Sequence, residues 1–311
     1  MNDAVSDILG FDGTVLLSDW GVIRAHGADA ASFLQGQLTQ DVQQLDAGQA
    51  RLAGYCSAKG RLLATFIVWR EGPEDIAMAC SADLLPATLK RLSMFVMRAR
   101  CKLADASVEY ALSGLAGPSA QAWLAAAAPE AVWTCTAQHG GRAIRLPDAP
   151  GVPRYLFVAP AGVARPALPA LSLAQWQWLE VRSGVARVTA ATAEQFVPQM
   201  LNLELLGGVN FQKGCYPGQE VVARSQYRGT LKRRTYLMDC TAPLAPGQEV
   251  VHSADPTQPA GMVVLAASLT PLRHCALVEL KIASLVGGEL RAGDVLLSPA
   301  ALPYSLAALA D

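Results

Sequence analysis

One short stretch of the chain, residues 213–220, places a base, a thiol, an amide and a carboxylate within eight positions: Lys213, Cys215, Gln219 and Glu220. Two glycines and a proline lie among them. Because glycine reaches backbone angles closed to other residues and proline fixes one angle, these residues predict a tight turn. Such a turn would present the four side chains from one rigid frame. An ordinary glycine-rich loop with a chance cysteine is the alternative.

Three kinds of chemistry fit these residues. Cys215 could act as a nucleophile, with Lys213 supplying positive charge to stabilise a thiolate, but the four histidines lie far away in sequence and suggest no general base. The thiol could instead ligate a metal transiently, since one cysteine is too few for a stable site. In the third hypothesis, Lys213 and backbone N–H groups face an anion while Gln219 and Glu220 hydrogen-bond a heterocycle.

A run of bases follows this stretch and suggests a fourth possibility. Five bases lie within eleven positions, with no acid between Val221 and Met238: Arg224, Arg228, Lys232, Arg233 and Arg234. With tyrosines at 227 and 236, this basic run could hold an RNA backbone. It could equally be a solvated edge or bind the acidic tail of a ligand. The net charge of −1 favours these two readings over nucleic acid.

Length and composition limit the possible domain number, class and location of the protein. A chain of 311 residues suggests two or three domains, and 52% hydrophobic residues allow a large core. Seven cysteines without a CxxC pair predict neither a disulfide framework nor an intrinsic metal site. The first residues are acidic without an apolar signal core, and no apolar run is long enough to cross a bilayer. We therefore expect a cytoplasmic protein with reduced thiols and no membrane contact.

Local patterns in the first third predict the elements that must support these residues. Residues 14–24 predict a short strand pair. Asp29 and Asp83 are each placed to cap a helix. The turn at 56–61 feeds a strongly apolar strand at 62–69.

Three bases are expected at the far end of the helix that follows Asp83: Arg98, Arg100 and Lys102. Positive charge there compensates the negative end of the helix dipole. We favour this interpretation over a phosphate site.

In the middle of the chain, the proline-rich residues 147–153 predict a loop. Ser172 and Gln175 form a capping box for a helix that runs to about Arg182. Trp178 within this helix is expected in the core or in a domain seam.

The pattern changes after the basic run. Five short strands are predicted there: 235–238, 249–251, 261–265, 276–280 and 294–297. Proline and glycine turn signals separate them, including one at Pro259. This spacing predicts a small all-β barrel or sandwich. We therefore divide the chain into residues 1–231 and 232–311.

Residues 213–220, together with 222–224 and 227–229, resemble the signature of the YgfZ folate-binding family. These proteins are relatives of the glycine-cleavage T-protein, an aminomethyltransferase. The resemblance also covers three upstream segments: 27–41, 56–61 and 196–202.

The resemblance implies an α+β fold with two interwoven domains around a central hole of folate size, followed by a C-terminal all-β barrel. It implies tetrahydrofolate or a one-carbon derivative as cofactor, and a role in maintaining iron–sulfur enzymes, including those that thiolate tRNA. By resemblance, Cys215 and Lys213 inherit the reactive role, with Cys215 a possible transient metal ligand. Gln219, Glu220 and Arg228 inherit contacts to the folate.

Two positions depart from the T-protein pattern. In T-proteins the segment matching Lys59-Gly60 leads to an aspartate that assists aminomethyl transfer, but Arg61–Phe66 contains no carboxylate here. T-proteins also carry a pterin-recognising glutamate two residues before the glycine that matches Gly184, where this chain has Arg182. Trp178, Glu180 and Arg182 are the candidate pterin contacts that remain. Both departures argue against a classical aminomethyltransferase, because the folate amine needs a placed acid.

The sequence thus predicts a folate-binding accessory protein that supports iron–sulfur cluster assembly or repair in enzymes, including the tRNA methylthiolases. Its partners would be folate and these client enzymes. Two alternatives stay open. One is a tetrahydrofolate-dependent aminomethyltransferase, and the other is a tRNA-binding module that uses residues 224–234.

Overall fold

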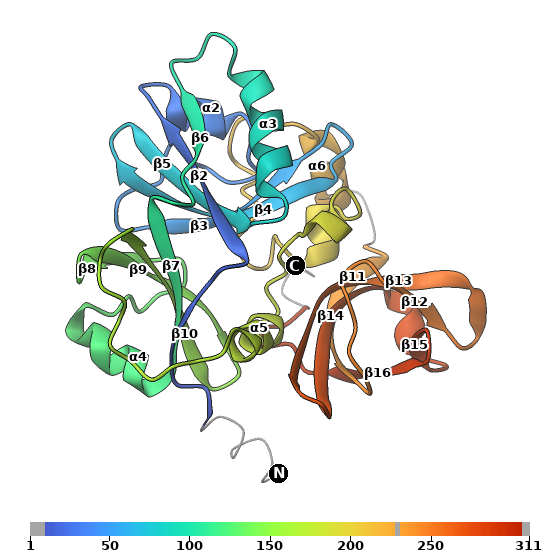
Figure 1. Cartoon of the computed structure of the whole chain (residues 1–311). Coiled ribbons are helices and arrows are strands. Elements are labelled where there is room, and N and C mark those ends of the chain that lie inside the picture. Colours follow the sequence, from blue (N-terminus) through green and yellow to red (C-terminus); the bar gives the residue numbers. More distant parts are fainter. Residues whose placement is uncertain (1–9, 228–230, 307–311) are drawn as a thin grey trace. The chain divides into compact units, whose positions relative to one another are not determined.

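The computed structural model describes residues 10–227 and 231–306 and has the predicted α+β class, with two five-stranded sheets and a closed barrel (Figure 1). Backbone contacts divide it into two compact units. Unit 1 comprises the chain up to Gln35, Asp41–Leu52 and Phe66–Trp176. Unit 2 comprises Gly36–Gln40, Ala53–Thr65 and the chain from Gln177. Each unit therefore collects segments that lie far apart in sequence.

The first sheet lies in unit 1 and has the strand order β1-β7-β10-β9-β8. Its strands are β1 (Gly13–Leu16), β7 (Tyr110–Ala116), β8 (Cys135–Gln138), β9 (Gly141–Ala149) and β10 (Val152–Pro160). Helix α4 (Gly117–Leu124), followed by the 3-10 turn η2 (Ala125–Ala127), covers one face. Leu115, Tyr155 and Phe157 of the sheet pack there with Ala120 and Leu124 of the helix.

The predicted loop at 147–153 is wrong, because these residues belong to the β9–β10 hairpin. Pro147 is tolerated in β9 because β8 pairs only with residues 141–144 of that strand. The missing N–H of Pro147 therefore falls beyond the segment covered by β8, where a sheet accepts proline.

The second sheet has the order β3-β4-β5-β2-β6. Its strands are β2 (Trp20–His26), β3 (Ala50–Cys56), β4 (Leu62–Gly72), β5 (Asp75–Ser81) and β6 (Lys102–Asp105). The predicted apolar strand after the 56–61 turn is confirmed as β4. The strand pair expected at 14–24 is corrected, since β1 pairs with β7 while β2 pairs with β5 and β6.

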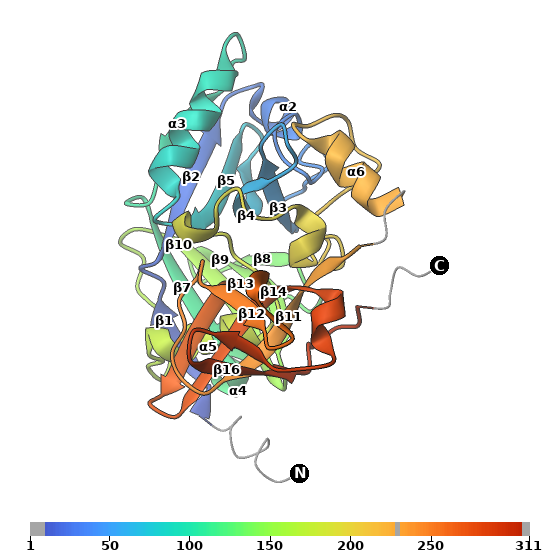
Figure 2. The ribbon, with the colours of Figure 1, turned by 90° about the vertical axis from the view of Figure 1, so that its right-hand side faces the viewer.

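Two helices accompany this sheet: α2 (Ala30–Gln35) and α3 (Leu85–Val96) (Figure 2). Neither is capped as predicted. The Asp29 carboxylate accepts hydrogen bonds from the backbone N–H and the guanidinium of Arg100. Helix α3 begins after Leu84 without a side-chain cap, so Asp83 does not fill that role. A partner 71 residues away outcompetes the local helix end for the Asp29 carboxylate.

Helix α5 (Leu173–Arg182) confirms its predicted capping box. The Ser172 N–H donates to Gln175 Oε1 at 2.9 Å, and the Gln175 N–H donates to Ser172 Oγ at 3.1 Å. Trp178 is buried, as expected for a core residue.

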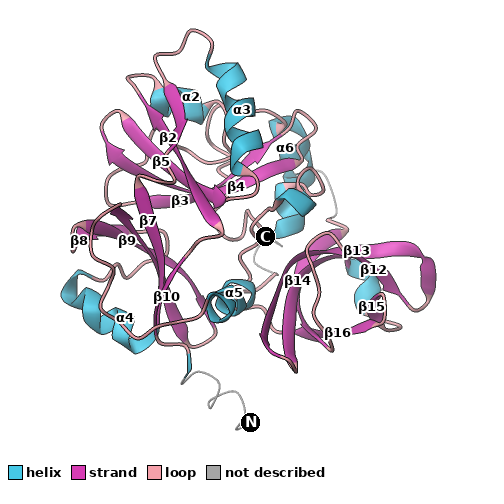
Figure 3. Cartoon of the chain, in the orientation of Figure 1, coloured by secondary structure: helices cyan, strands magenta, loops and turns pink. Residues whose placement is uncertain are grey.

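Six strands close the C-terminal barrel in the order β11-β14-β13-β12-β15-β16 (Figure 3). They are β11 (Arg233–Cys240), β12 (Glu249–His252), β13 (Asp255–Thr270), β14 (Arg273–Lys281), β15 (Leu290–Ala292) and β16 (Val295–Ala300). The interior is apolar, with Met238, Val250 and Val278 fully buried. This confirms the predicted barrel. Pro259 is not a turn, however, because β13 runs through it and absorbs it at an irregular register opposite Val251.

The remaining elements are short. They are the 3-10 turns η3 (Ala190–Thr192), η4 (Pro198–Leu201) and η5 (Ile282–Leu285), and helix α6 (Gln219–Tyr227). Among the described residues, none of the helices is both long and apolar enough to span a bilayer.

Candidate functional site

Helix α6 and the loop before it carry the residues that the sequence singled out. The loop is held by local hydrogen bonds, with the Gln212 N–H donating to Asn210 Oδ1 at 2.8 Å. At the other end, the Val221 and Val222 N–H groups both reach the Gly218 carbonyl, which starts the helix. Gln219 and Glu220 are therefore residues of the first helical turn and not of a loop.

Two glycines let this helix start pack against the 57–60 turn, also within unit 2. Gly218 has φ +79°, and a Cβ built there would lie 2.5 Å from the Ser57 carbonyl oxygen and 2.6 Å from Gly60 Cα. Gly60 has φ +70°, and a Cβ built there would lie 2.9 Å from Val221 Cβ. Real Cβ atoms do not come so close, so both positions need glycine. The sequence indicated the role of Gly218 in a turn but not its contact with Gly60.

Lys213 points into the protein. Its side chain is buried, and Nζ donates to the Leu38 carbonyl at 2.6 Å. The ammonium also lies 5.0 Å from the ring centroid of Tyr216, within the range of a cation–π contact. The base therefore ties the loop to the 36–40 segment.

Cys215 has the opposite environment. It is the one exposed cysteine among the seven, and its thiol has no hydrogen-bond partner among the residues that the structure describes. The single rigid frame predicted for four presented side chains is thus corrected. The thiol is exposed, the base is buried, and the amide and carboxylate belong to α6.

Tyr216, between them, fills the space under the loop and is buried. Burial raises its pKa, and the nearby Cys56 thiol raises it further. Cys56 is itself buried, and the loss of water raises its pKa to about 12. Both groups are therefore protonated at neutral pH, so this layer packs without charge apart from Lys213.

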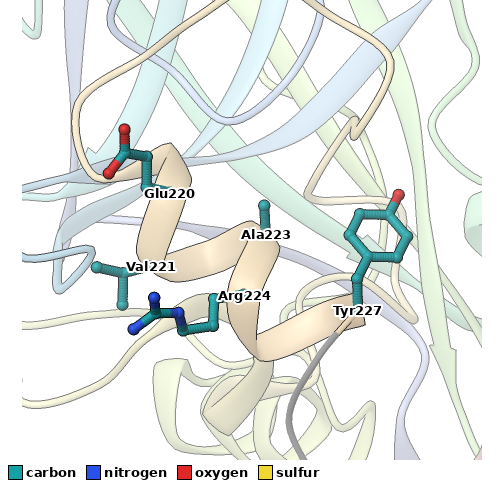
Figure 4. A pocket seen from close by; sticks show the side chains of 5 residues that line it. All are labelled: Glu220, Val221, Ala223, Arg224 and Tyr227. Carbon is teal, nitrogen blue, oxygen red and sulfur yellow. The ribbon is translucent and has the colours of Figure 1, made fainter.

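The outer face of α6 lines a pocket of about 490 Å³ (Figure 4). Its described lining residues are Glu220, Val221, Ala223, Arg224 and Tyr227. Within the described part of the chain, neither the Glu220 carboxylate nor the Arg224 guanidinium has an ion-pair partner. The pocket thus offers an acceptor, a donor and an aromatic ring to a ligand.

The sequence linked Tyr227 to the basic run and not to a small-molecule pocket. Tyr227 is 70% exposed, and its ring packs edge-to-face on Phe211, with the centroids 5.7 Å apart. The signal was present in the helical spacing of Glu220, Arg224 and Tyr227, which recur every three to four residues. It could be read only once the helix was known to begin at Gln219.

The opposite face of α6 is anchored inside unit 2. Val222 is fully buried, and its carbonyl accepts a hydrogen bond from Gln199 Nε2 at 2.8 Å. The carbonyl of Gln199 in turn accepts from the Arg234 guanidinium at 3.1 Å. Arg234 belongs to barrel strand β11, so one glutamine links the candidate site to the barrel.

The three candidates on α5 are engaged within the protein. Glu180 and Arg187 form a buried ion pair, with Nε–Oε1 at 2.9 Å. Arg182 pairs with Asp239 and lies over the buried Trp178 ring at 4.7 Å. None of the three candidates is among the described residues that line the α6 pocket.

The basic run is not a continuous cationic strip, and this corrects the pattern on which RNA contact was based. Arg233 donates to Glu279 at 2.8 Å, and the buried Arg234 pairs with Glu204. Both acids come from distant parts of the sequence. Lys232 is exposed, Arg224 lines the pocket, and Arg228 lies outside the described residues.

Within the described residues, no three side chains of the types that bind metals gather at one place. Cys215 therefore does not belong to a group of three or more such side chains within those residues. A complete ligand set that includes this thiol would need at least one further ligand from outside those residues.

Comparison with known proteins defines the family. A protein from Serratia proteamaculans, named tRNA-modifying protein YgfZ, is 31% identical over 309 residues, spanning 94% of this chain and 92% of that protein. The protein of the same name from Klebsiella pneumoniae is 34% identical over 240 residues, spanning 74% and 72%. The chain belongs to the YgfZ family.

The chain also matches the family model of the GCVT N-terminal domain over residues 13–143. Its fold is that of the glycine cleavage system aminomethyltransferase T from Bartonella henselae, with a TM-score of 0.75 at 20% identity. The match covers 96% of this chain and 88% of that structure. The resemblance inferred from the motif is thereby confirmed.

Proposed function

We propose that this YgfZ-family chain is a folate-binding accessory protein of tRNA modification, which supports iron–sulfur enzymes such as the tRNA methylthiolases. Relatives that span most of the chain are named tRNA-modifying proteins, which supports the link to tRNA. The observation that carries the proposal is the exposed, unpartnered thiol of Cys215 beside a structurally fixed helix start. Such a thiol is available to a partner enzyme, either as a transient ligand to its cluster iron or as a redox-sensitive group.

Folate binding is supported by the chemistry of the α6 pocket. Its volume of about 490 Å³ falls in the range of small-molecule sites. The Glu220 carboxylate can accept hydrogen bonds from the N–H groups of a pterin, and Gln219 on the same turn can add an amide. Arg224 can pair with a carboxylate of the glutamate tail. A bound folate would supply one-carbon or redox chemistry, while these residues would bind and orient it.

Glu180 and Arg182 are both held in ion pairs within the protein, which favours an accessory role over an aminomethyltransferase activity. The Glu180 carboxylate is buried and already accepts two hydrogen bonds from Arg187, so it is not open to a folate amine from solvent. The 61–66 segment likewise contributes no acid. The proposal therefore assigns Cys215, and not a carboxylate, as the reactive group.

The test is complementation of a bacterial strain that lacks its YgfZ protein, with methylthiolated adenosine in tRNA measured by mass spectrometry. We expect the wild-type chain to restore the modification and Cys215→Ser to fail. Cys101→Ser is the matched control, because this half-buried cysteine lies in unit 1 outside the site. Native labelling with a thiol reagent should detect a rapidly reacting thiol in the wild type and in Cys101→Ser. This thiol should be missing only from Cys215→Ser.

Two further measurements separate the alternatives. Calorimetric titration with tetrahydrofolate should show saturable binding that Glu220→Gln and Arg224→Gln weaken. A glycine-cleavage assay with the lipoyl carrier should show no turnover. Full complementation by Cys215→Ser would overturn the accessory mechanism, and turnover in the glycine-cleavage assay would establish the transferase instead.

A further inference from the structure

Helix α3 in unit 1 carries an exposed surface that the proposed function does not use. Its inner face is buried through Leu85, Thr88 and Leu92, which pack the helix toward β2 and β6. The outer face continues past the helix end at Val96 toward β6. We call the following residues the α3 surface: Lys90, Arg91, Met94, Phe95, Met97 and Arg98. Figures 1 and 2 show this end of α3 and the loop after it projecting beyond the ends of β2 and β5.

The centre of the α3 surface is apolar and open to solvent. Met94 is 60% exposed, Phe95 47% and Met97 86%. Met94 and Phe95 follow Lys90 and Arg91 at helical spacing, and Met97 and Arg98 come directly after the helix ends at Val96. Together these residues run as one stripe along this end of α3. Three large apolar groups gathered at a projecting helix end form a patch rather than the scattered exposure that is normal for a surface.

Bases border this stripe at both ends. Lys90 and Arg98 are exposed, and within the described residues neither has an acidic partner. No acid occurs in residues 84–104. Arg98 lies beyond the last helical turn and Lys102 lies in β6, so the predicted compensation of the helix dipole does not account for them. Arg100 is the exception, since it pairs with Asp29.

We propose that the α3 surface binds an acidic amphipathic helix of a partner protein. Charge complementarity favours acidic side chains at the edges of the partner helix, because Lys90 and Arg98 lie on either side of the apolar centre. The centre itself selects a protein, since methionines adapt to apolar side chains and Met, Phe and Arg are enriched in protein interfaces. An RNA backbone would contact the bases but leave Met94 and Met97 in water. The partner helix would place apolar residues at i, i+3, i+4 and i+7 over the stripe, with Glu or Asp at its edges.

The test uses the full chain and a synthetic helical peptide of about five turns, with Leu and Phe on one face and Glu on its borders. Binding is measured by fluorescence anisotropy at low salt. A control peptide keeps the apolar face but carries Lys in place of Glu. We expect saturable binding of the Glu peptide that weakens as salt rises, and none of the Lys peptide.

Two double variants separate the apolar contribution to peptide binding from the contribution of the bases. Met94→Gln with Met97→Gln, and Lys90→Glu with Arg98→Glu, should each weaken binding by about ten-fold or more. The charge-reversed variant should gain affinity for the Lys peptide, which a folding defect could not cause. Leu272→Gln is the matched control, because this residue is 90% exposed in the barrel, and it should bind like wild type.

Unchanged binding in both double variants would overturn the proposal, as would failure of the Glu peptide to bind. Parallel titrations use purified tRNA and vesicles that contain anionic lipid. If either of these bound through the α3 surface while the peptide did not, the surface would be assigned to that ligand instead.

Discussion

At the scale of single residues, Lys213 and Cys215 show how two neighbours in one motif acquire different tasks. Backbone position decides the outcome, because the Leu38 carbonyl lies within hydrogen-bond distance of Lys213, whereas no comparable group among the described residues contacts Cys215. A buried ammonium is stable only where acceptors or aromatic faces replace water. We therefore infer that Lys213 holds the loop, while Cys215 stays exposed for the proposed chemistry.

This assignment predicts that Lys213→Met lowers the free energy of unfolding by about 2 kcal/mol, the usual contribution of a hydrogen bond from a charged donor. Urea unfolding followed by circular dichroism measures it. Lys59→Met, at an exposed position on the 57–60 turn, should change stability by less than about 0.5 kcal/mol. A Lys213→Met protein of wild-type stability that fails to support tRNA modification would instead return Lys213 to a direct chemical role.

The sequence could nominate these residues because their types are reactive and closely spaced. It could not orient them, since the groups that decide orientation lie far away along the chain. Leu38 is 175 residues from Lys213. The basic run is the same case, because Glu204 and Glu279 neutralise Arg234 and Arg233 only once the barrel has formed.

At the scale of elements, the start of helix α6 depends on close backbone packing. Gly218 and Gly60 bring the helix and the 57–60 turn closer than any side chain allows. The exposed loop and the α6 pocket are thus held on a rigid support. Loss of this contact would let the helix start shift while its far face stayed anchored through Val222.

Gly218→Ala should therefore destabilise the protein by about 2 kcal/mol or more, since it adds both left-handed strain and a steric clash. Gly214→Ala is the matched control in the same loop, because a Cβ there meets nothing within 4 Å. Unfolding midpoints of the two variants provide the measurement. Equal midpoints would mean that α6 does not depend on the glycine contact.

Element prediction succeeded where the signal is local and failed where it is not. The capping box of α5 uses two residues three positions apart, and it formed as predicted. The pairing of β1 and β2 was misassigned because neighbours in sequence entered different sheets. Pro147 and Pro259 suggested breaks, yet each lies in a strand where an unpaired edge or an irregular register tolerates it.

At the scale of the whole molecule, the cysteines report how the chain is packed. Five of the seven are buried: Cys56, Cys80, Cys135, Cys240 and Cys275. Cys240 and Cys275 lie on paired barrel strands, and Cys56 lies beneath the candidate site. Loss of water raises the pKa of each of these three thiols from 9.0 to about 12. At alkaline pH the folded protein therefore keeps thiol protons that the unfolded chain releases.

This difference predicts that stability falls as pH rises above about 9. Below the unfolded pKa both states hold the thiol protons, so the full stability is present. Between that value and the folded pKa of about 12, the unfolded state binds fewer protons and is therefore stabilised relative to the folded state as pH rises. Each thiol contributes up to about 1.4 kcal/mol per pH unit.

The measurement is the free energy of urea unfolding, in the presence of a reductant, from about pH 8 to about pH 10, before the tyrosines contribute strongly. Cys275→Ala should have a shallower pH slope than the wild type, although the small cavity lowers its stability near pH 8. Val278→Ala, a buried truncation on the same strand without a titrating group, should lose stability equally at every pH. If the slope of Cys275→Ala matched that of Val278→Ala, the buried thiol would not be the group that links the fold to alkaline pH.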